Sequence, residues 1–533
     1  MNVGAARFAG ARPPRWQWAA AVTLLYAAIV IVASLYHEPW RDEVVALSIA
    51  RSPSSLSALA AALKLQGHPI LWYVVLREAY ALVGQTWVLK AASLASAIGA
   101  IFLFIRCCPL PWWLRLLFTF SVFPLYQYSV VSRGYSLEML LLFAFCALHS
   151  RRREEPLALA VVLAALANTE LLGFIIAAAA AVALLFEGVW WGSGWRHWVR
   201  DRRMVFAAAI YAAGLLLAVM VAFPDPSHTG SAVRQLDLGR ITAAVGGAMV
   251  WPAGHARGLS SVVRGLSLWV WAYFLYLTRR PVLLCFAATA LIGIEASFTL
   301  VYGPAPWHLG NVLLVVIATM WLDASGSTPT SVFSPRLEHV QSWLGPILAG
   351  GVTVLLTEHA LLGILFVVND LGHDFSSSRR LGELLRGDPA LAGAVVLGEP
   401  DPWITSLPYY AANAIYLPRE DAYQSWDQYT PARRSTYDLA ALLAAARAVR
   451  ARCACPVVIV MGFEMEPAGV HKIFGGGGSP VEETFAITPE ARAEFLAATR
   501  RIASLRGEEI FPALRHARLR VNTDEHYDVY VLR

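Results

Sequence analysis

Long apolar runs constrain this chain more than any other feature. Its hydrophobic residues recur in runs of about twenty, the length that an α-helix needs to cross the hydrocarbon core of a bilayer. The composition agrees, because 57% of the 533 residues are hydrophobic, only 15% are charged and the mean hydropathy is +0.53. Such a chain is too apolar for a water-soluble globule. We therefore predict an α-helical polytopic membrane protein.

The N-terminus gives the first orientation signal. Arg7, Arg12 and Arg15 precede the first apolar run, residues 16–36. That run is longer than a signal-peptide core and lacks a small-residue cleavage pattern after it. Because basic residues favour the cytoplasmic side, we expect a retained first span with a cytoplasmic N-terminus.

Residues 68–83 decide the sidedness of everything that follows. If they lie on the outer surface, the next span is 87–105 and the later basic clusters fall inside. These clusters are Arg106, Arg115, residues 151–153, residues 195–203 and residues 279–280. If residues 68–83 cross the membrane instead, every one of these clusters moves outside, against the positive-inside rule. We therefore expect residues 68–83 to lie on the outer surface.

This choice predicts about eleven crossings in an inner, cytoplasmic membrane. The expected spans are 16–36, 87–105, 112–130, 134–149, 156–168, 171–189, 203–222, 261–278, 281–302, 308–322 and 343–367. An odd number of crossings places the C-terminal part outside. The outer loops are then 37–86, 131–135, 168–171, 223–260 and 303–308.

The polar residues set against apolar runs gather in these outer loops. They are Asp42, Glu43, His68, Arg133, Tyr135, Asn168, Glu170 and His308. The first loop begins with His37-Glu38-Pro39-Trp40-Arg41-Asp42-Glu43, and a carboxylate at this depth is costly unless it is paired, solvated or used. Two interpretations stay open for the seven residues: a functional site, or an interfacial loop in which Arg41 neutralises Asp42 or Glu43.

The composition changes near residue 376. Residues 1–375 form the expected membrane domain, with a catalytic first outer loop at 37–86, and residues 376–533 form the expected extracytoplasmic α/β domain. Short β-type runs (394–398, 414–417, 457–462, 527–532) alternate there with helical patterns (379–385, 432–452, 489–505). Aromatic residues such as Trp403, Tyr409, Tyr410 and Tyr423 suit either stacking on sugars or packing against the membrane domain.

The six cysteines do not suggest a disulfide framework. Cys107 and Cys108 are adjacent, Cys146 and Cys285 lie in apolar runs, and we expect Cys453 and Cys455 to be too close in sequence to pair without strain. Nothing about them suggests a metal site.

The outer polar residues suit glycosyl transfer from a lipid-linked donor. That reaction needs a carboxylate to accept the proton of an acceptor hydroxyl and cations to hold the departing phosphate. Asp42 and Glu43 are the candidates for this carboxylate. Arg133 is the better phosphate ligand, because a guanidinium binds phosphate oxygens in bidentate fashion, and His68 and His308 are further donors.

The order of motifs resembles the GT-C superfamily of membrane glycosyltransferases, in particular bacterial relatives of protein O-mannosyltransferases and aminoarabinose transferases. The resemblance rests on Arg41-Asp42-Glu43, then Gly67-His68-Pro69-Ile70-Leu71-Trp72-Tyr73, then Ser132-Arg133-Gly134-Tyr135-Ser136-Leu137. It covers the membrane domain, most specifically residues 37–140. It implies a GT-C type fold and transfer of a sugar from a polyprenyl-phosphate carrier to an acceptor hydroxyl at the outer face, the acceptor being a lipid, a glycan or a protein.

The resemblance also implies roles for individual residues. Asp42 matches the catalytic acid of the first loop, with Glu43 as helper or substitute. His68 matches the second motif and Arg133 with Tyr135 the third. Arg41, Asn168, Glu170 and Trp307 are expected to line the cavity, and Trp307-His308 resembles a polar step before a late span. Some relatives have a further carboxylate where this chain offers only Glu138, so a divalent cation stays open and no metal ligand is assigned.

Two other classes of function make different predictions. A transporter or flippase for a lipid-linked sugar predicts inverted repeats and polar residues near the bilayer midplane, whereas here they concentrate at one face. A scaffold that only displays its C-terminal domain predicts that substituting Asp42 has no effect. A basic, aromatic-interleaved tract that would indicate nucleic-acid binding is absent from the sequence.

Overall fold

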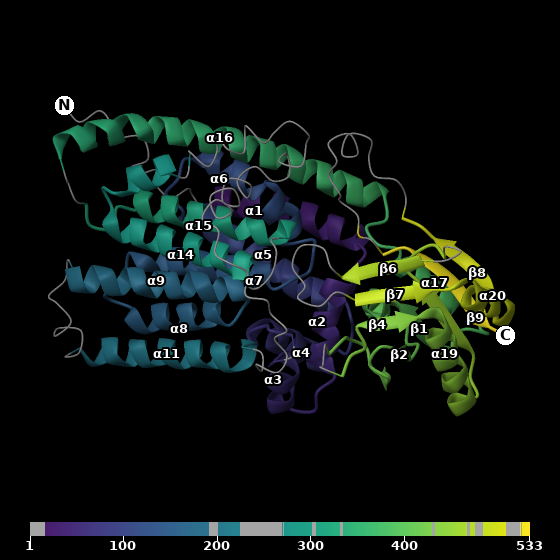
Figure 1. Cartoon of the computed structure of the whole chain (residues 1–533). Helices are drawn as coiled ribbons and strands as arrows, with labels where there is room; N and C mark the ends of the chain where they lie inside the picture. Colours follow the sequence, from purple (N-terminus) through teal and green to yellow (C-terminus); the bar gives the residue numbers. More distant parts are fainter. Residues whose placement is uncertain are drawn as a thin grey trace.

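The computed structural model describes residues 16–64, 66–190, 201–223, 269, 271–300, 305–330, 334–428, 432–465, 469–474, 483–507, 523 and 525–533. Apolar helices form one part of the molecule and a mixed α/β fold forms the C-terminal part (Figure 1). Of the predicted outer loop 223–260, only Phe223 belongs to the described residues, and the predicted span 261–278 is described at 269 and 271–278.

Seven helices in the described ranges are long and apolar enough to cross a membrane. They are α1 (Trp16–Tyr36), α5 (Val88–Cys107), α9 (Leu171–Trp190), α11 (Arg202–Ala222), α14 (Pro281–Leu300), α15 (Pro306–Ala324) and α16 (Pro335–Gly372). Two shorter apolar helices join them, α7 (Tyr135–His149) and α8 (Pro156–Ala167). Each of these helices falls on a predicted span, so the molecule is a multi-pass membrane protein.

The predicted crossing at 112–130 is not one continuous helix. The chain forms α6 (Trp112–Thr119) and then a π-helical turn, η1 (Phe123–Gln127). Pro124 explains the change, because it has no backbone N–H to donate to the preceding turn. The apolar periodicity indicated burial correctly but not continuity.

Three short helices of the first loop lie at the end of the bundle that faces the C-terminal domain (Figure 1). They are α2 (Arg41–Arg51), α3 (Leu56–Lys64) and α4 (Leu71–Val83). Helix α4 has 13 residues, about 20 Å, which is shorter than a hydrocarbon core of about 30 Å. Its last turn is closed by Gly84 in the left-handed conformation, with φ of 69°.

Helix α16 links the two parts of the molecule. Its 38 residues run along the whole helical bundle and end beside the sheet of the C-terminal domain (Figure 1). At about 1.5 Å per residue it is longer than a bilayer core requires. Its last turn therefore reaches the level of the first loop, where Asp370 meets His37.

A six-stranded sheet organises the C-terminal part, in the order β3-β2-β1-β5-β9-β8. Its strands are β1 (Val395–Glu399), β2 (Ile415–Leu417), β3 (Ala422–Tyr423), β5 (Val457–Met461), β8 (Thr499–Leu505) and β9 (Tyr527–Leu532). β1 pairs in parallel with β2 and β5, and the outer pairs are antiparallel. A smaller sheet has the order β4 (Thr436–Asp438), β7 (Glu483–Ile487) and β6 (Gly469–Phe474). The helices are α17 (Ser378–Gly387), α18 (Leu407–Tyr410), α19 (Leu439–Cys453) and α20 (Pro489–Ala498), with a 3-10 turn, η4 (Asp401–Ile404).

The predicted α/β class is confirmed, with three corrections of detail. The helix predicted over 432–452 begins only at Leu439, because residues 436–438 form strand β4, which pairs with β7. The helix predicted over 489–505 ends at Ala498, and 499–505 is strand β8, because the antiparallel partner β9 satisfies its backbone. Cys453 and Cys455 form a disulfide, contrary to expectation. Ala454 between them adopts a left-handed conformation with φ of 49°, which brings the two Cα atoms to 5.1 Å.

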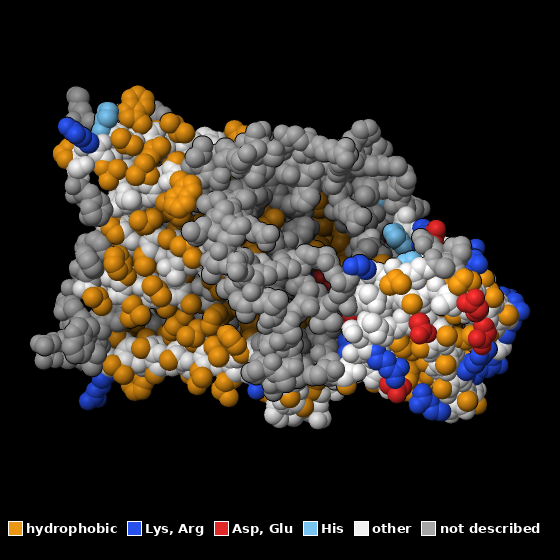
Figure 2. Space-filling model, in the orientation of Figure 1, with side chains coloured by type: hydrophobic (Ala, Val, Ile, Leu, Met, Phe, Trp, Pro, Cys, Tyr) orange, Lys and Arg blue, Asp and Glu red, His pale blue; other side chains and the backbone are white. Residues whose placement is uncertain are grey.

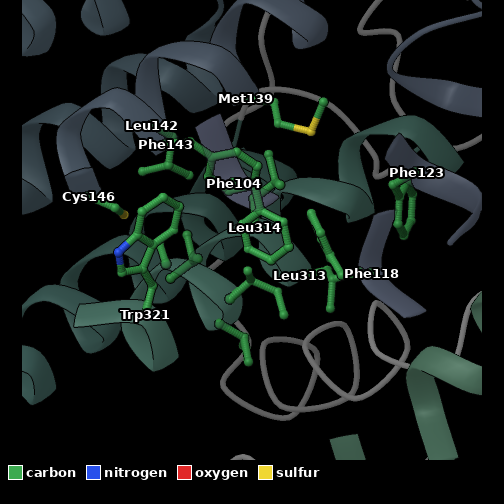
Figure 3. Packing of buried hydrophobic residues seen from close by; sticks show 14 of the residues in the cluster. Phe104, Phe118, Phe123, Met139, Leu142, Phe143, Cys146, Leu313, Leu314 and Trp321 are labelled. Atoms are coloured by element: carbon green, nitrogen blue, oxygen red, sulfur yellow. The ribbon is translucent and has the colours of Figure 1, made fainter. Parts of the chain in front are cut away.

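The membrane part has an aromatic core. Phe104 lies 4.8 Å from Phe118 and 5.0 Å from Phe143, measured between ring centroids, and Trp321 packs beside them (Figure 3). The surface differs between the two parts: hydrophobic side chains cover the described helices, whereas charged side chains gather over the C-terminal part (Figure 2). This contrast fits a bilayer around the first and water around the second.

Candidate active site

The acidic pair of the first loop opens helix α2. Asp42 and Glu43 lie in its first turn, where the positive end of the helix dipole favours carboxylates. The helix periodicity points the two side chains in different directions. As a result the two carboxylates contact different partners, and they differ in burial.

Glu43 is completely buried and fully engaged. One carboxylate oxygen lies 2.9 Å from Nε2 of His37 and accepts the backbone N–H of Trp40 at 3.3 Å. The other accepts the backbone N–H of Ser132, the residue before Arg133. Glu43 therefore joins the first loop to the loop that carries Ser132 and Arg133.

His37 extends this network to the end of helix α16. Its Nδ1 lies 2.9 Å from Asp370, so the buried imidazole is held between two carboxylates. Burial alone would lower the pKa of His37, but Asp370 and Glu43 raise it to about 10. His37 is therefore a cation that ties three segments together.

Asp42 faces the other way and keeps 30% of its side chain exposed. Its nearest cation is Arg133, whose guanidinium lies 3.2 Å from Oδ2, and Arg41 follows at 3.8 Å from Oδ1. Asp42 is thus an accessible carboxylate with a cation beside it. The first loop and the second meet in this ion pair.

Arg133 is itself held by aromatic rings. Its guanidinium carbon lies 4.9 Å from the ring centre of Trp307 and 5.4 Å from that of Tyr135, and 14% of the side chain is exposed. Tyr135 stacks on Tyr128 at 5.2 Å. These cation–π contacts hold the guanidinium through its face, while one of its N–H groups pairs with Asp42.

A second polar pair lies beside Gly134, the residue that follows Arg133. His68 Nδ1 is 3.2 Å from Glu170, with 39% of the histidine side chain exposed. Gly134 explains how Glu170 comes so close, because a Cβ at this position would lie 2.5 Å from its carboxylate oxygen. Asn168 fixes the local backbone by accepting the N–H of Leu71 at 2.8 Å through its own carbonyl.

His308 also reaches this region, in a more enclosed position. Its ring lies 6.2 Å from that of Tyr135. The backbone N–H of Ala305 and the indole N–H of Trp307 each approach one ring nitrogen to 3.0 Å. Each ring nitrogen of His308 therefore faces an N–H donor of the protein. Arg133, in contrast, supplies N–H donors itself.

The C-terminal domain supplies contacts that the sequence did not indicate. Glu525 accepts the backbone N–H of Arg41 at 3.0 Å and lies 3.5 Å from its guanidinium. Arg379 pairs with Glu38 at 3.1 Å, and the hydroxyl of Tyr410 donates to the carbonyl of Pro39 at 2.8 Å. These partners lie hundreds of residues from the first loop, so no local pattern could have revealed them.

All ten residues named from the sequence therefore lie in connected clusters at one end of the bundle. Arg133 contacts Asp42, Trp307 and Tyr135. His68 contacts Glu170 directly, and Glu43 is buried in the protein interior. Within the described ranges, three or more His, Cys, Asp or Glu side chains do not converge as metal ligands do.

Comparisons with known proteins give structural likenesses at low sequence identity. The chain matches no protein-family model and no curated protein sequence. It is similar to the crystal structure of ArnT from Cupriavidus metallidurans bound to undecaprenyl phosphate, with a TM-score of 0.49 and 12% identity over 97% of this chain and 98% of that one. The apo state of the same protein gives 0.44 and 11%, over 95% and 97%. The arabinofuranosyltransferase AftD from mycobacteria gives 0.41 and 14%, over 98% of this chain and 40% of AftD.

Proposed function

We propose that this protein is a membrane glycosyltransferase that moves a sugar from a polyprenyl-phosphate carrier to an acceptor hydroxyl. The observation that carries the proposal is the pairing of a part-exposed carboxylate, Asp42, with the aromatic-held guanidinium of Arg133. The motif order of the first two outer loops, which resembles that of GT-C glycosyltransferases, supports the same conclusion.

Asp42 is the proposed base. Its oxygen accepts the proton of the acceptor hydroxyl while that hydroxyl oxygen attacks the anomeric carbon of the donor sugar. The bond between that carbon and the phosphate oxygen breaks, and its electron pair stays on the phosphate. Glu43 does not take this role in our proposal, because both of its oxygens are buried and hydrogen-bonded.

Arg133 is the proposed phosphate ligand. Its N–H groups can hold two phosphate oxygens at once and stabilise the charge that grows on the leaving group. In the structure the same guanidinium pairs with Asp42, so an arriving phosphate would compete for it and leave the carboxylate free to act as a base. His68, oriented by Glu170, supplies a second donor. Both ring nitrogens of His308 face N–H donors, so in our proposal it lines the cavity and does not donate to the phosphate.

The proposed chemistry lies at the outer face of the cytoplasmic membrane. The basic loops support a cytoplasmic N-terminus, and the Cys453–Cys455 disulfide supports an oxidising compartment for the C-terminal domain. Lipid-linked donors suit this face, since the bilayer itself delivers the polyprenyl chain. We propose residues 1–375 as the membrane domain and 376–533 as the extracytoplasmic domain.

Mass spectrometry of envelope glycans and lipids tests the proposal. A strain that lacks the gene should lose one sugar substituent that its parent carries, and the wild-type gene should restore it. The missing substituent would identify both the sugar and the acceptor. Identical envelope profiles in the two strains would contradict the proposal.

A further inference from the structure

A large open groove lies away from the Asp42–Arg133 pair, at the junction of the first loop with the C-terminal domain. Its volume is about 830 Å³, within the range of roughly 300–1,000 Å³ typical of ligand pockets. The end of helix α2 forms one wall, helix α17 another, and the segment from α18 to strand β3 the rest. Both the catalytic loop and the C-terminal domain thus contribute to it.

Two arginines line this groove without a carboxylate partner. Arg51 ends helix α2 and Arg386 lies in the last turn of α17. Neither forms an ion pair with any residue in the described part of the chain, although Arg51 lies 5.7 Å from the ring centre of Tyr80. Two uncompensated cations at one groove favour an anionic ligand.

Tyrosine rings supply flat surfaces in the same groove. Tyr423 is 50% exposed and is braced by Tyr416, with ring centroids 5.1 Å apart. Tyr409 is braced in the same edge-on way by Tyr410, also at 5.1 Å. Rings held by neighbours can receive the apolar face of a sugar at little cost in side-chain entropy.

Polar side chains complete the wall with hydrogen-bond acceptors. The amide nitrogen of Asn413 donates to the carbonyls of Leu391 and Ala394, each at 2.9 Å, which fixes its carboxamide. Its Oδ1 has no hydrogen bond to the described residues, and the same holds for Ser425 Oγ. The side-chain nitrogen of Gln424, also in this wall, donates a hydrogen bond to the carboxylate of Glu420. Acceptors of this kind suit the hydroxyl groups of a saccharide.

We propose that this groove binds an anionic oligosaccharide, one that carries carboxylate or phosphate groups, as part of the acceptor. The location supports the role, because Arg51 and Asp42 lie near opposite ends of the 11-residue helix α2, about 13 Å apart along its axis. An acceptor chain of a few sugar units can cover that distance. This inference rests on the proposed glycosyl transfer for its role, but the binding itself can be measured separately.

Direct binding tests the groove without any transfer reaction. The full chain in detergent is titrated with tetragalacturonate, a phosphorylated oligomannoside and neutral maltotetraose, and affinity is read by tryptophan fluorescence or calorimetry. We expect at least one anionic saccharide to bind, more weakly at high salt, and the double variant Arg51→Gln with Arg386→Gln to lose at least tenfold in affinity. Tyr423→Ala should also weaken binding.

Arg500→Gln is the matched control. Arg500 is an exposed arginine on strand β8, at the opposite edge of the sheet from β2 and β3, and its loss should leave the affinity unchanged. Saccharide binding that ignores charge, or that the double arginine variant retains, would overturn the proposal. Arginine-dependent binding of phosphatidylglycerol vesicles without any saccharide binding would also overturn it, in favour of a lipid surface.

Transfer kinetics separate this inference from the proposed function. With the natural acceptor, the double arginine variant should raise the KM for acceptor about tenfold and leave kcat and the KM for donor unchanged. Asp42→Asn should abolish transfer yet bind the anionic saccharide as the wild type does. If transfer fails in every form of the protein while arginine-dependent binding persists, the proposed reaction is wrong. The proposal that the groove binds an anionic saccharide would then still hold.

Discussion

At the scale of single residues, the two acids of the first loop have different surroundings. Asp42 is part-exposed beside Arg133, whereas Glu43 is buried among donors from the first and second loops. A neighbouring pair of carboxylates in a sequence suggests interchangeable roles. One residue of offset on a helix turns a side chain by about 100°, so the pair here faces two environments.

Arg133 gives the first prediction at this scale. Arg133→Ala should reduce donor affinity about 10- to 100-fold, since a hydrogen bond to a charged group contributes about 1.5–3 kcal/mol, while the KM for acceptor changes little. Arg133→Lys should recover only part of the loss, because lysine keeps the charge but not the fork of donors. Steady-state kinetics with both substrates varied provide the measurement. A larger effect on acceptor than on donor would contradict the assigned role.

Gly134 gives the second prediction at the scale of single residues. A methyl group there would lie 2.5 Å from the Glu170 carboxylate, so Gly134→Ala should displace Glu170 from His68 and reduce kcat/KM about 10- to 100-fold. Gly99→Ala is the matched control, because its nearest neighbour is a leucine side-chain atom at 3.5 Å. Equal activity of the two variants would show that the position of Glu170 is unimportant.

At the scale of elements, the buried cluster around His37 anchors the loop to helix α16. His37→Gln should lower the free energy of unfolding by about 3–5 kcal/mol, since it leaves Glu43 and Asp370 without their shared cation. The loop should then detach from the end of α16, and hydrogen exchange of residues 37–43 should rise.

This cluster also predicts a pH dependence. The pKa of His37 is raised from 6.5 to about 10 in the folded protein, so its stabilising contribution is complete below pH 6.5 and disappears as the pH rises through about 10. Lys90 from α5 and Glu38 also face this cluster. The melting temperature of the wild type should therefore exceed that of His37→Gln most at pH 6 and least at pH 10. A difference that grows with pH would contradict the assignment.

The sequence predicted the elements better than their partners. Runs of apolar residues located the described spans, because burial in a bilayer leaves a long uniform signal. The break at Pro124, the strand at 499–505 and the disulfide through Ala454 depend on local backbone geometry and on tertiary partners. The contact between His37 and Asp370 spans 333 residues, and no periodicity encodes such a pairing.

The candidate site was predicted from its residue types and not from its geometry. Motif order brought Asp42, His68 and Arg133 together on one face, and the structure gives them neighbouring positions. The aromatic support of Arg133 by Trp307, and the contact of Arg41 with Glu525, required the fold.

At the scale of the whole molecule, the first loop is held between the helical bundle and the C-terminal domain. Glu38, Pro39 and Arg41 each contact the C-terminal part, through Arg379, Tyr410 and Glu525. The two parts therefore act together on the loop that carries Asp42. A structural change in the helical bundle should therefore affect the C-terminal domain, and the reverse.

The proposed orientation predicts which residues a membrane-impermeant maleimide reaches. Cys107, exposed at the end of α5, should stay unlabelled in intact spheroplasts and react after permeabilisation, because its end of the helix is expected in the cytoplasm. Arg386→Cys in a Cys107→Ala background should react in intact spheroplasts. The reverse labelling pattern would invert the topology and remove the chemistry from the outer face.

The most direct test of the central claim is restoration of the missing envelope sugar by Asp42→Asn in a deletion strain. The variant should accumulate in the membrane at the wild-type level and restore less than about 1% of the product, as expected when an essential base is lost. Asp388→Asn, an exposed aspartate that keeps its hydrogen-bond acceptor, should restore it fully. Wild-type levels of product from Asp42→Asn would contradict the account.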